Sequence, residues 1–132
     1  MKVIIDAGLL EGGMSAEAAA RVIGGLLSGV VRANVDYLRR HPWTPHPYRA
    51  GLRYQREPRG QEHWKGISQI LRDRHGDCED LSAYLAAWYI ARGQKAQIHL
   101  TWKRTRRGGR LFHVQVRGPS GRIEDPSRVL GM

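Results

Sequence analysis

Cysteine is nearly absent from this chain, because Cys78 is the only one among 132 residues. A single cysteine excludes an internal disulfide, which fits a reducing compartment such as the cytoplasm. A chain of this length is long enough for one hydrophobic core but not for two. We therefore expect residues 1–132 to form one domain, with an N-terminal part over residues 1–60 and a core over residues 61–132.

Long apolar runs are also lacking. The longest, residues 22–31, is bounded by Arg21 and Arg32 and is far shorter than the about 20 residues that span a bilayer. The apolar run near the start ends at Asp6, which makes it too short for the apolar region of a signal peptide. We therefore expect no membrane partner and no secretion by a standard signal.

Acidic residues are few compared with basic ones, 12 against 22, which gives a net charge of +10. Part of this excess falls in one short segment, which holds Lys103, Arg104, Arg106, Arg107 and Arg110. Such a patch can meet a polyanion: nucleic acid, an acidic cell-wall polymer or an acidic protein. The alternative is a solvated hairpin without a partner. No helix-turn-helix or zinc-finger pattern is recognisable, so a basic nucleic-acid-binding protein is an alternative function only.

What the chain does have is a strongly patterned helix that begins at its one cysteine. Apolar residues recur at helical spacing, at Leu81, Tyr84, Leu85, Trp88 and Ile90. Asp77 can cap the start, with Asp80 completing a capping box, and Gly93 can end the helix in a left-handed conformation. The pattern predicts a helix from about Cys78 to about Arg92 with the thiol on its buried side.

The position of the thiol makes Cys78 a candidate nucleophile. Free backbone N–H groups and the helix dipole stabilise a thiolate at a helix N-terminus. Three carboxylates, those of Asp77, Glu79 and Asp80, oppose this because like charges raise the pKa of a thiol. If they point to solvent, screening weakens them, and a histidine in contact outweighs them. Cys78 therefore needs a histidine partner.

The histidine comes from a predicted β-hairpin. Residues 97–102 and 111–116 are rich in strand formers and are joined by an Arg- and Gly-rich turn, and a third short run covers residues 122–125. Alternation places His113 and Gln115 on one face of the second strand. Asp125 can lie opposite His113 on the neighbouring strand. Nucleophile, base and orienting carboxylate thus follow one another as Cys78, His113 and Asp125.

These segments resemble the transglutaminase-like cysteine enzymes of the papain-like superfamily. The matching segments are residues 76–81, 112–116 and 123–126, within a resemblance that covers about residues 64–132. Residues 48–54 look like the segment that precedes this motif in small, stand-alone members from bacterial viruses and prophages. The resemblance implies an α+β fold in which N-terminal helices pack on a small antiparallel sheet. It also implies a place in the cytoplasm of a bacterial host or in a virion.

The activity implied is acyl transfer through a thioester on Cys78, with a protein or peptide substrate. His113 would act as base and Asp125 would fix its tautomer. The backbone N–H of Cys78 and one more donor would hold the oxyanion, the candidates being Gln69, Tyr54 and Trp64. Water as acceptor gives a peptidase, which we favour. An amine gives a transglutaminase, and a virion or assembly protein without catalysis is a further alternative.

The remaining segments are expected to frame this site. A helix from Ser15 as N-cap to Arg40 should be the first ordered element, with Gly25 and Gly29 packing closely on the core. A proline-rich connector over residues 41–60 follows. Its aromatic residues, Trp43, Tyr48 and Tyr54, either contact substrate or fasten the connector to the core. Residues 64–71 should form a short helix.

Metal binding is a weak alternative. His75 and the acidic residues around Cys78 include possible ligands, but zinc sites prefer paired soft donors and there is no second cysteine. His99 reads as a structural strand residue because no acidic residue is near it in sequence. We predict neither a metal nor another cofactor.

Overall fold

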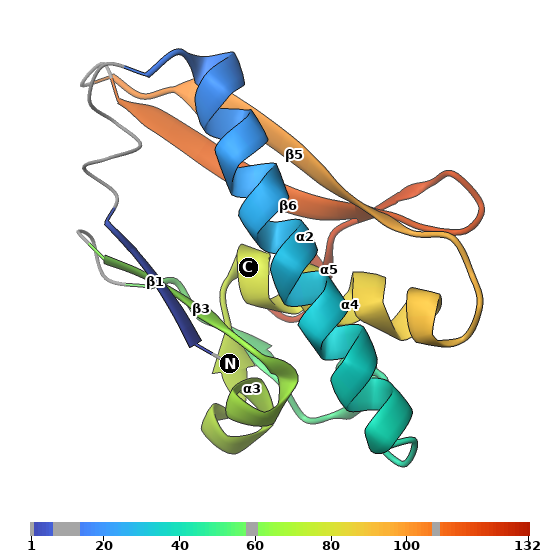
Figure 1. Ribbon diagram of the computed structural model, residues 1–132. Coiled ribbons are helices and arrows are strands. Elements are labelled where there is room, and N and C mark those ends of the chain that lie inside the picture. Colours follow the sequence, from blue (N-terminus) through green and yellow to red (C-terminus); the bar gives the residue numbers. More distant parts are fainter. Residues whose placement is uncertain (1, 7–13, 58–60, 107–108) are drawn as a thin grey trace.

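The helix that begins at Cys78 lies at the centre of an α+β fold (Figure 1). The computed structural model describes residues 2–6, 14–57, 61–106 and 109–132. In chain order the elements are β1 (Lys2–Asp6), α2 (Ala16–Arg40), the 3₁₀ helix η1 (Pro47–Arg49), β2 (Arg53–Tyr54), β3 (Gln61–Lys65), α3 (Ile67–Asp73), β4 (His75–Gly76), α4 (Cys78–Ala91), β5 (Gln97–Arg104), β6 (Arg110–Arg117), β7 (Ile123–Glu124) and α5 (Pro126–Val129).

The strands of the described segments form small sheets rather than one large one. The largest has the order β5-β6-β7 and is antiparallel throughout. Strands β1 and β3 form an antiparallel pair, and β2 and β4 form a short parallel pair directly before α4. The last pair brings Arg53 and Tyr54 of the connector beside the residues that lead into Cys78.

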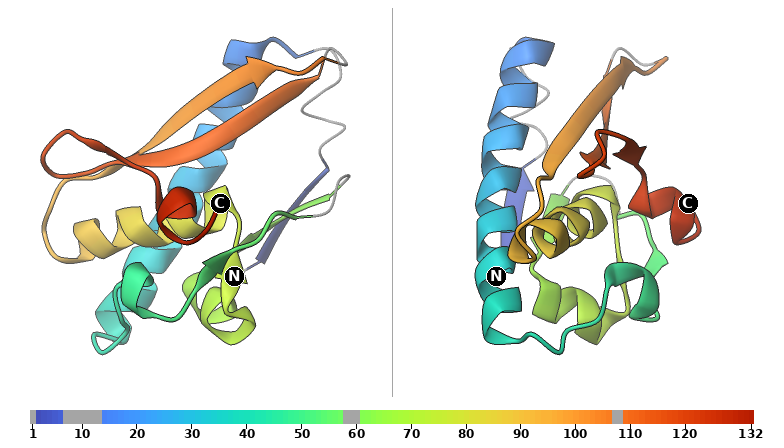
Figure 2. Two further views of the ribbon diagram at one scale, coloured as in Figure 1. Left: turned by 180° about the vertical axis from the view of Figure 1, so that it is seen from behind. Right: turned by 90° about the vertical axis from the view of Figure 1, so that its right-hand side faces the viewer.

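Helix α4 is covered on two sides. Helix α2 packs along one side of it and α5 contacts another, as the right-hand view of Figure 2 shows. The long β5–β6 hairpin crosses above α4 and reaches the N-terminal end of α2 (Figures 1 and 2). The site therefore lies where α4, β6 and α5 meet.

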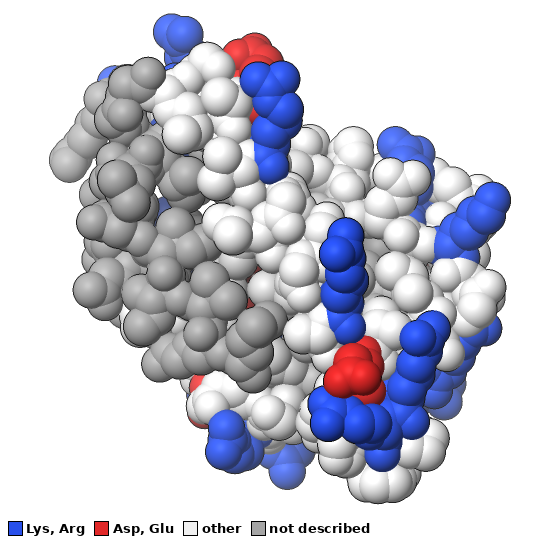
Figure 3. Space-filling view, in the orientation of Figure 1, with Lys and Arg blue, Asp and Glu red and all other residues white. Residues whose placement is uncertain are grey.

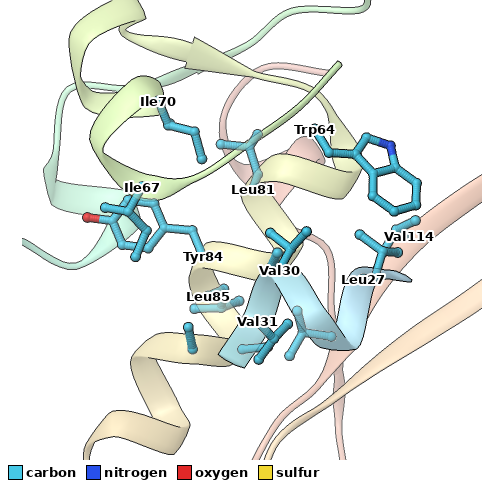
Figure 4. Close-up of a cluster of buried hydrophobic side chains, with 14 of the residues drawn as sticks. Leu27, Val30, Val31, Trp64, Ile67, Ile70, Leu81, Tyr84, Leu85 and Val114 are labelled. Atoms are coloured by element: carbon cyan, nitrogen blue, oxygen red, sulfur yellow. The ribbon is translucent and has the colours of Figure 1, made fainter. Parts of the chain in front are cut away.

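The core explains why α4 is so apolar. Leu81, Tyr84 and Leu85 of α4 are fully buried, and they meet Leu27 of α2 and Val114 of β6 in one cluster (Figure 4). A buried leucine contributes about 1.5–3 kcal/mol through removal of its apolar surface from water. Packing on two sides thus fixes the rotation of α4 about its axis, and with it the direction of the Cys78 side chain.

The predicted helices with clear caps are confirmed. Helix α2 covers Ala16–Arg40, and Ser15 Oγ accepts from the backbone N–H of Ala18 at 3.1 Å. Helix α4 covers Cys78–Ala91, and Gly93 follows it with φ +77°, the left-handed region that favours glycine. The hairpin and the third short strand are also confirmed, as β5, β6 and β7.

Two expectations are wrong, and a third, the short helix over residues 64–71, is confirmed only in part. The first ordered element is the strand β1, not α2, because residues 2–6 pair with β3 more than fifty residues away. Trp64 and Lys65 belong to that same strand β3, and helix α3 begins only at Ile67. Gly25 and Gly29 do not pack closely, since a Cβ built on either would meet nothing within 4 Å.

Helix α2 is long and apolar enough, by length and composition, to cross a membrane. Its buried residues, among them Ile23, Leu27 and Val30, belong to the hydrophobic core and pack toward α4. We therefore describe α2 as a core helix of the domain.

Candidate active site

The first turn of α4 is fixed by a reciprocal capping box. The backbone N–H of Asp80 donates to Asp77 Oδ1 at 3.1 Å, and the N–H of Asp77 donates to Asp80 Oδ2 at 3.2 Å. The other oxygen of Asp80 accepts from the N–H of Lys65 at 2.7 Å, which ties the helix to β3. Gly76 is required just before it, because a Cβ there would lie 2.9 Å from Asp80 Cβ. Cys78 therefore sits on a rigid turn.

The same helix docks on the open edge of β6 through residues one turn apart. The thiol of Cys78 accepts a hydrogen bond from the backbone N–H of Val114, and Ser82 Oγ donates to Val114 O at 2.9 Å. The N–H and C=O of one strand residue point to the same side, and β7 pairs with β6 only at Val116 and Arg117. The edge beside Val114 is thus left for α4, and the thiol lies next to the histidine strand.

His113, the residue before Val114, is hydrogen-bonded to a carboxylate. Its Nε2 lies 2.7 Å from Asp125 Oδ2, and Gln115 Nε2 donates to the same oxygen at 3.2 Å. A carboxylate can only accept, so Nε2 carries the proton and the neutral ring has its lone pair on Nδ1. The prediction that Asp125 lies beside His113 and that His113 and Gln115 share a face is confirmed.

The element that holds Asp125 differs from the predicted strand. Asp125 follows β7 and is the N-cap of α5, where its Oδ1 accepts from the backbone N–H of Arg128 at 3.3 Å. Partial burial on its own raises the pKa of Asp125, but the hydrogen bonds from His113 and Gln115 outweigh it and the pKa falls below its ordinary value. Asp125 is therefore charged at neutral pH.

The expected thiolate is not the resting form of Cys78. Burial is the largest cause that raises the pKa of the thiol well above its ordinary value, followed by the charges of Glu79 and Asp77. These carboxylates are only 7 % and 6 % exposed, so solvent cannot screen them as the sequence-based expectation required. The thiol donates to Glu79 Oε2 at 3.3 Å. Among the described residues no hydrogen bond joins Cys78 to His113: the thiol donates to Glu79, and Nε2 of His113 bonds Asp125.

Of the three predicted oxyanion donors, Tyr54 is the one on a strand that pairs with the residues leading into Cys78. It pairs with Gly76 across the short β2–β4 sheet, two residues before Cys78. Burial is the largest cause that raises the pKa of Tyr54, followed by the electrostatic effects of Cys78 and Asp77.

The other two predicted donors are engaged elsewhere. The amide of Gln69 donates to Asp73 Oδ1 at 2.8 Å on the outer side of α3. The side chain of Trp64 is 1 % exposed and lies in the core beside Leu27 and Val114 (Figure 4).

The residues predicted to contact substrate lie in different parts of the structure. Burial is the largest cause that raises the pKa of Tyr48, followed by the electrostatic effects of Glu124, Tyr89 and Asp125, and its ring packs edge-on against His46. Trp43 is 76 % exposed and packs edge-on against His41, at the end of α2. Arg104 and Arg106 are exposed at the far end of the hairpin, and Arg107 lies outside the described residues.

Sequence reasoning missed two supporting residues. Gln115 braces Asp125 and Ser82 fixes α4 to β6. Both could have been found from periodicity, because Gln115 follows His113 by two residues on a strand and Ser82 follows Cys78 by four on a helix. The role of Glu79 as hydrogen-bond acceptor of the thiol had no such signal.

Carboxylate oxygens of Glu57, Asp77 and Asp80 lie within 4.8 Å of one another. Both oxygens of Asp80 already accept backbone N–H groups, and Asp77 caps α4. Burial and the neighbouring Asp77 raise the pKa of Asp80 well above its ordinary value. A protonated carboxyl relieves the repulsion within this group, so the helix cap accounts for it and we assign no metal there.

Comparison of the chain with protein-family models, with curated proteins and with solved structures gives no match. The function proposed below therefore depends on the geometry of Cys78, His113 and Asp125.

Proposed function

We propose that the protein cleaves peptide or amide bonds through a thioester on Cys78, on a transglutaminase-like core of the papain-like type. The observation that carries this proposal is the arrangement on β6. His113 is bonded to Asp125 at 2.7 Å, and the N–H of the next residue, Val114, bonds the Cys78 thiol. A nucleophile at a helix start beside a base, with a carboxylate behind the base, is the arrangement that cysteine acyl transfer requires. The host cytoplasm or a virion is the compartment that we propose with it.

The mechanism begins from a neutral thiol. The Cys78 proton passes to Nδ1 of His113 as the sulfur attacks the substrate carbonyl carbon, and Asp125 stabilises the imidazolium that forms. The amide C–N bond then breaks, and the leaving amine takes the proton from His113. Water, deprotonated by His113, attacks the thioester and releases the carboxylic acid and the free thiol. Because the resting thiol is neutral, His113 acts as a general base rather than as half of a preformed ion pair.

The two donors that we propose for the oxyanion are the backbone N–H of Cys78 and the hydroxyl of Tyr54. The raised pKa of Tyr54 keeps that hydroxyl protonated, and therefore a donor, at neutral pH. For sulfur to reach a substrate, its hydrogen bond to Glu79 must break. An amine that replaces water in the second step would make the same site a transglutaminase.

A second candidate function is a transglutaminase-like assembly protein without catalysis. The raised pKa of Cys78 and its hydrogen bond to the buried Glu79 favour this alternative. In that case the thiol would be an ordinary core residue, and the His113–Asp125 pair would serve only to fasten β6 to α5.

Hydrolysis of p-nitrophenyl acetate separates the two functions without a known substrate. We expect p-nitrophenol release that depends on Cys78 and falls by about 10²- to 10³-fold in His113→Ala, the range that a general base contributes. His99→Ala is the matched control, since His99 lies on the neighbouring strand β5. Equal rates for the wild type, Cys78→Ala and His113→Ala would reject the catalytic proposal in favour of the assembly protein.

A further inference from the structure

The far end of the β5–β6 hairpin is an exposed ribbon, which we call the basic arm and define as residues 101–106 and 109–112. Every residue from Thr101 to Arg106 is exposed, whereas His99 and Leu100, nearer the core, are half-buried. The arm reaches the N-terminal end of α2, where the Arg110 guanidinium donates to Met14 O at 2.7 Å (Figure 1). The arm is thus attached to the segment before α2, while residues 101–106 stay exposed to solvent.

The charge of the arm is of one sign. Residues 81–123 include nine Lys and Arg and no Asp or Glu, so almost all of the net charge of +10 comes from this part of the chain. None of the ion pairs within the described segments involves Lys103, Arg104 or Arg106. Acidic side chains are also sparse on the face seen in Figure 3. The cations of the arm are therefore available for an anionic partner.

An aromatic residue lies among these cations. Trp102 is 39 % exposed and pairs with Phe112 across the ribbon, and Arg104 pairs with Arg110 one step further on the same face. An exposed indole next to the guanidinium of Arg104 can stack on a nucleobase while the guanidinium binds a phosphate. Arginine suits phosphate because its planar fork makes two parallel hydrogen bonds.

The apolar residues of the arm argue against an anionic membrane. The two large exposed ones are Trp102 and Leu111, and they lie on opposite faces, because Leu111 pairs with Lys103. Insertion into a bilayer surface requires an apolar face on one side. The arm therefore has the composition of a stacking surface rather than that of a membrane anchor.

From these observations we propose that the basic arm binds single-stranded nucleic acid, with Trp102 stacking on a base and Lys103, Arg104 and Arg106 contacting phosphates. Thr101 pairs with His113, so the arm ends next to the proposed site on β6 but does not include the site residues. Binding is consequently independent of Cys78 and of the proposed acyl transfer. It would remain if the acyl-transfer proposal failed.

The test is fluorescence anisotropy of a labelled oligothymidine of about 12 nucleotides, within the site sizes of single-strand binders. We expect affinity to fall steeply with NaCl concentration, and the logarithmic salt slope to decrease by about 2 in the variant Lys103→Gln, Arg104→Gln, Arg106→Gln. Trp102→Ala should weaken binding by roughly fivefold or more and keep the salt slope, because stacking does not release counterions.

The matched control removes the same charge from the exposed face of α2, with Arg21→Gln, Arg32→Gln and Arg39→Gln. The proposal predicts that this variant keeps most of its affinity. It would be overturned if the control lost as much affinity as the arm variant, or if Trp102→Ala left oligonucleotide binding unchanged. Binding of anionic phospholipid vesicles that depends on the arm, without binding of the oligonucleotide, would also overturn it in favour of a membrane partner.

Discussion

Glu79 is the neighbouring carboxylate that raises the pKa of Cys78 most, after burial of the thiol. Its carboxylate is buried beside the thiol, accepts the S–H and raises the pKa of Cys78, after burial itself. Removing a neighbouring negative charge favours the thiolate, so the thiol pKa must fall in Glu79→Gln. We expect the pH midpoint of Cys78 alkylation by iodoacetamide to move down, and the rate at neutral pH to rise roughly threefold or more.

Glu17→Gln is the control for this experiment, because Glu17 lies in the first turn of α2 and is exposed. It should leave the alkylation profile unchanged. An unchanged profile in Glu79→Gln would show instead that burial alone keeps the thiol neutral.

Tyr54 is the proposed side-chain donor to the oxyanion. Tyr54→Phe removes the hydroxyl but keeps the aromatic ring. Loss of one such donor costs about 3 kcal/mol, so acylation by p-nitrophenyl acetate should slow by about 100-fold. Tyr37→Phe, on α2, is the control. A Tyr54→Phe rate close to that of the wild type would leave only the backbone N–H of Cys78 in this role.

At the residue scale, the identities in the site could be predicted but the ionisation of the thiol could not. The order of Cys78, His113 and Asp125 is visible in the sequence, and the bond between His113 and Asp125 is confirmed. The charge of the thiol depends first on its own burial and then on whether Asp77 and Glu79 face water, and tertiary packing decides both. A local pattern does not contain that information.

Ser82 joins two elements, and its removal should destabilise the protein. Ser82→Ala leaves the buried carbonyl of Val114 without the hydroxyl that donates to it at 2.9 Å. An unsatisfied buried acceptor costs about 1–3 kcal/mol, so the free energy of unfolding in urea should fall by that amount. Ser28→Ala, which removes an exposed hydroxyl bonded to Gly24 O, should change it by less than about 0.5 kcal/mol.

Helix α2 contains glycines that the packing does not require. A Cβ at Gly25 or Gly29 meets nothing within 4 Å, and glycine inside a helix costs about 1 kcal/mol relative to alanine. Each Gly→Ala change should therefore raise the free energy of unfolding by roughly 0.5–1 kcal/mol. Gly93→Ala, at φ +77°, should lower it by about 1–2 kcal/mol. Destabilisation by Gly25→Ala would reveal a contact that this face of α2 needs.

At the element scale, the features that depend on neighbouring residues could be predicted from the sequence. The capping box at Asp77 and the alternation around His113 depend on a few neighbouring residues, and both are confirmed. Strand β1 was missed because its pairing with Trp64 and Lys65 joins segments far apart in the chain. Because Trp64 takes part in this pairing, it lies in a strand and not in the helix predicted for it. Non-local pairing of this kind has no periodic signature in a short window.

The whole molecule is strongly cationic, so its thermal stability should depend on salt concentration. A net charge of +10 on 132 residues produces repulsion in the folded state that salt screens. We expect the melting temperature to rise by a few degrees between about 0.05 M and 0.5 M NaCl. The variant Lys103→Gln, Arg104→Gln, Arg106→Gln should show a smaller rise. A fall with salt would mean that attractive ion pairs outweigh the repulsion.

The proposed mechanism requires that Cys78 becomes acylated through the action of His113. The most direct measurement is peptide mapping by mass spectrometry of protein quenched early in its reaction with p-nitrophenyl acetate. We expect one acetyl group on Cys78, formed at least about 100-fold more slowly in His113→Ala. Acetyl groups confined to lysines, or an acetyl-Cys78 that forms equally fast without His113, would contradict it.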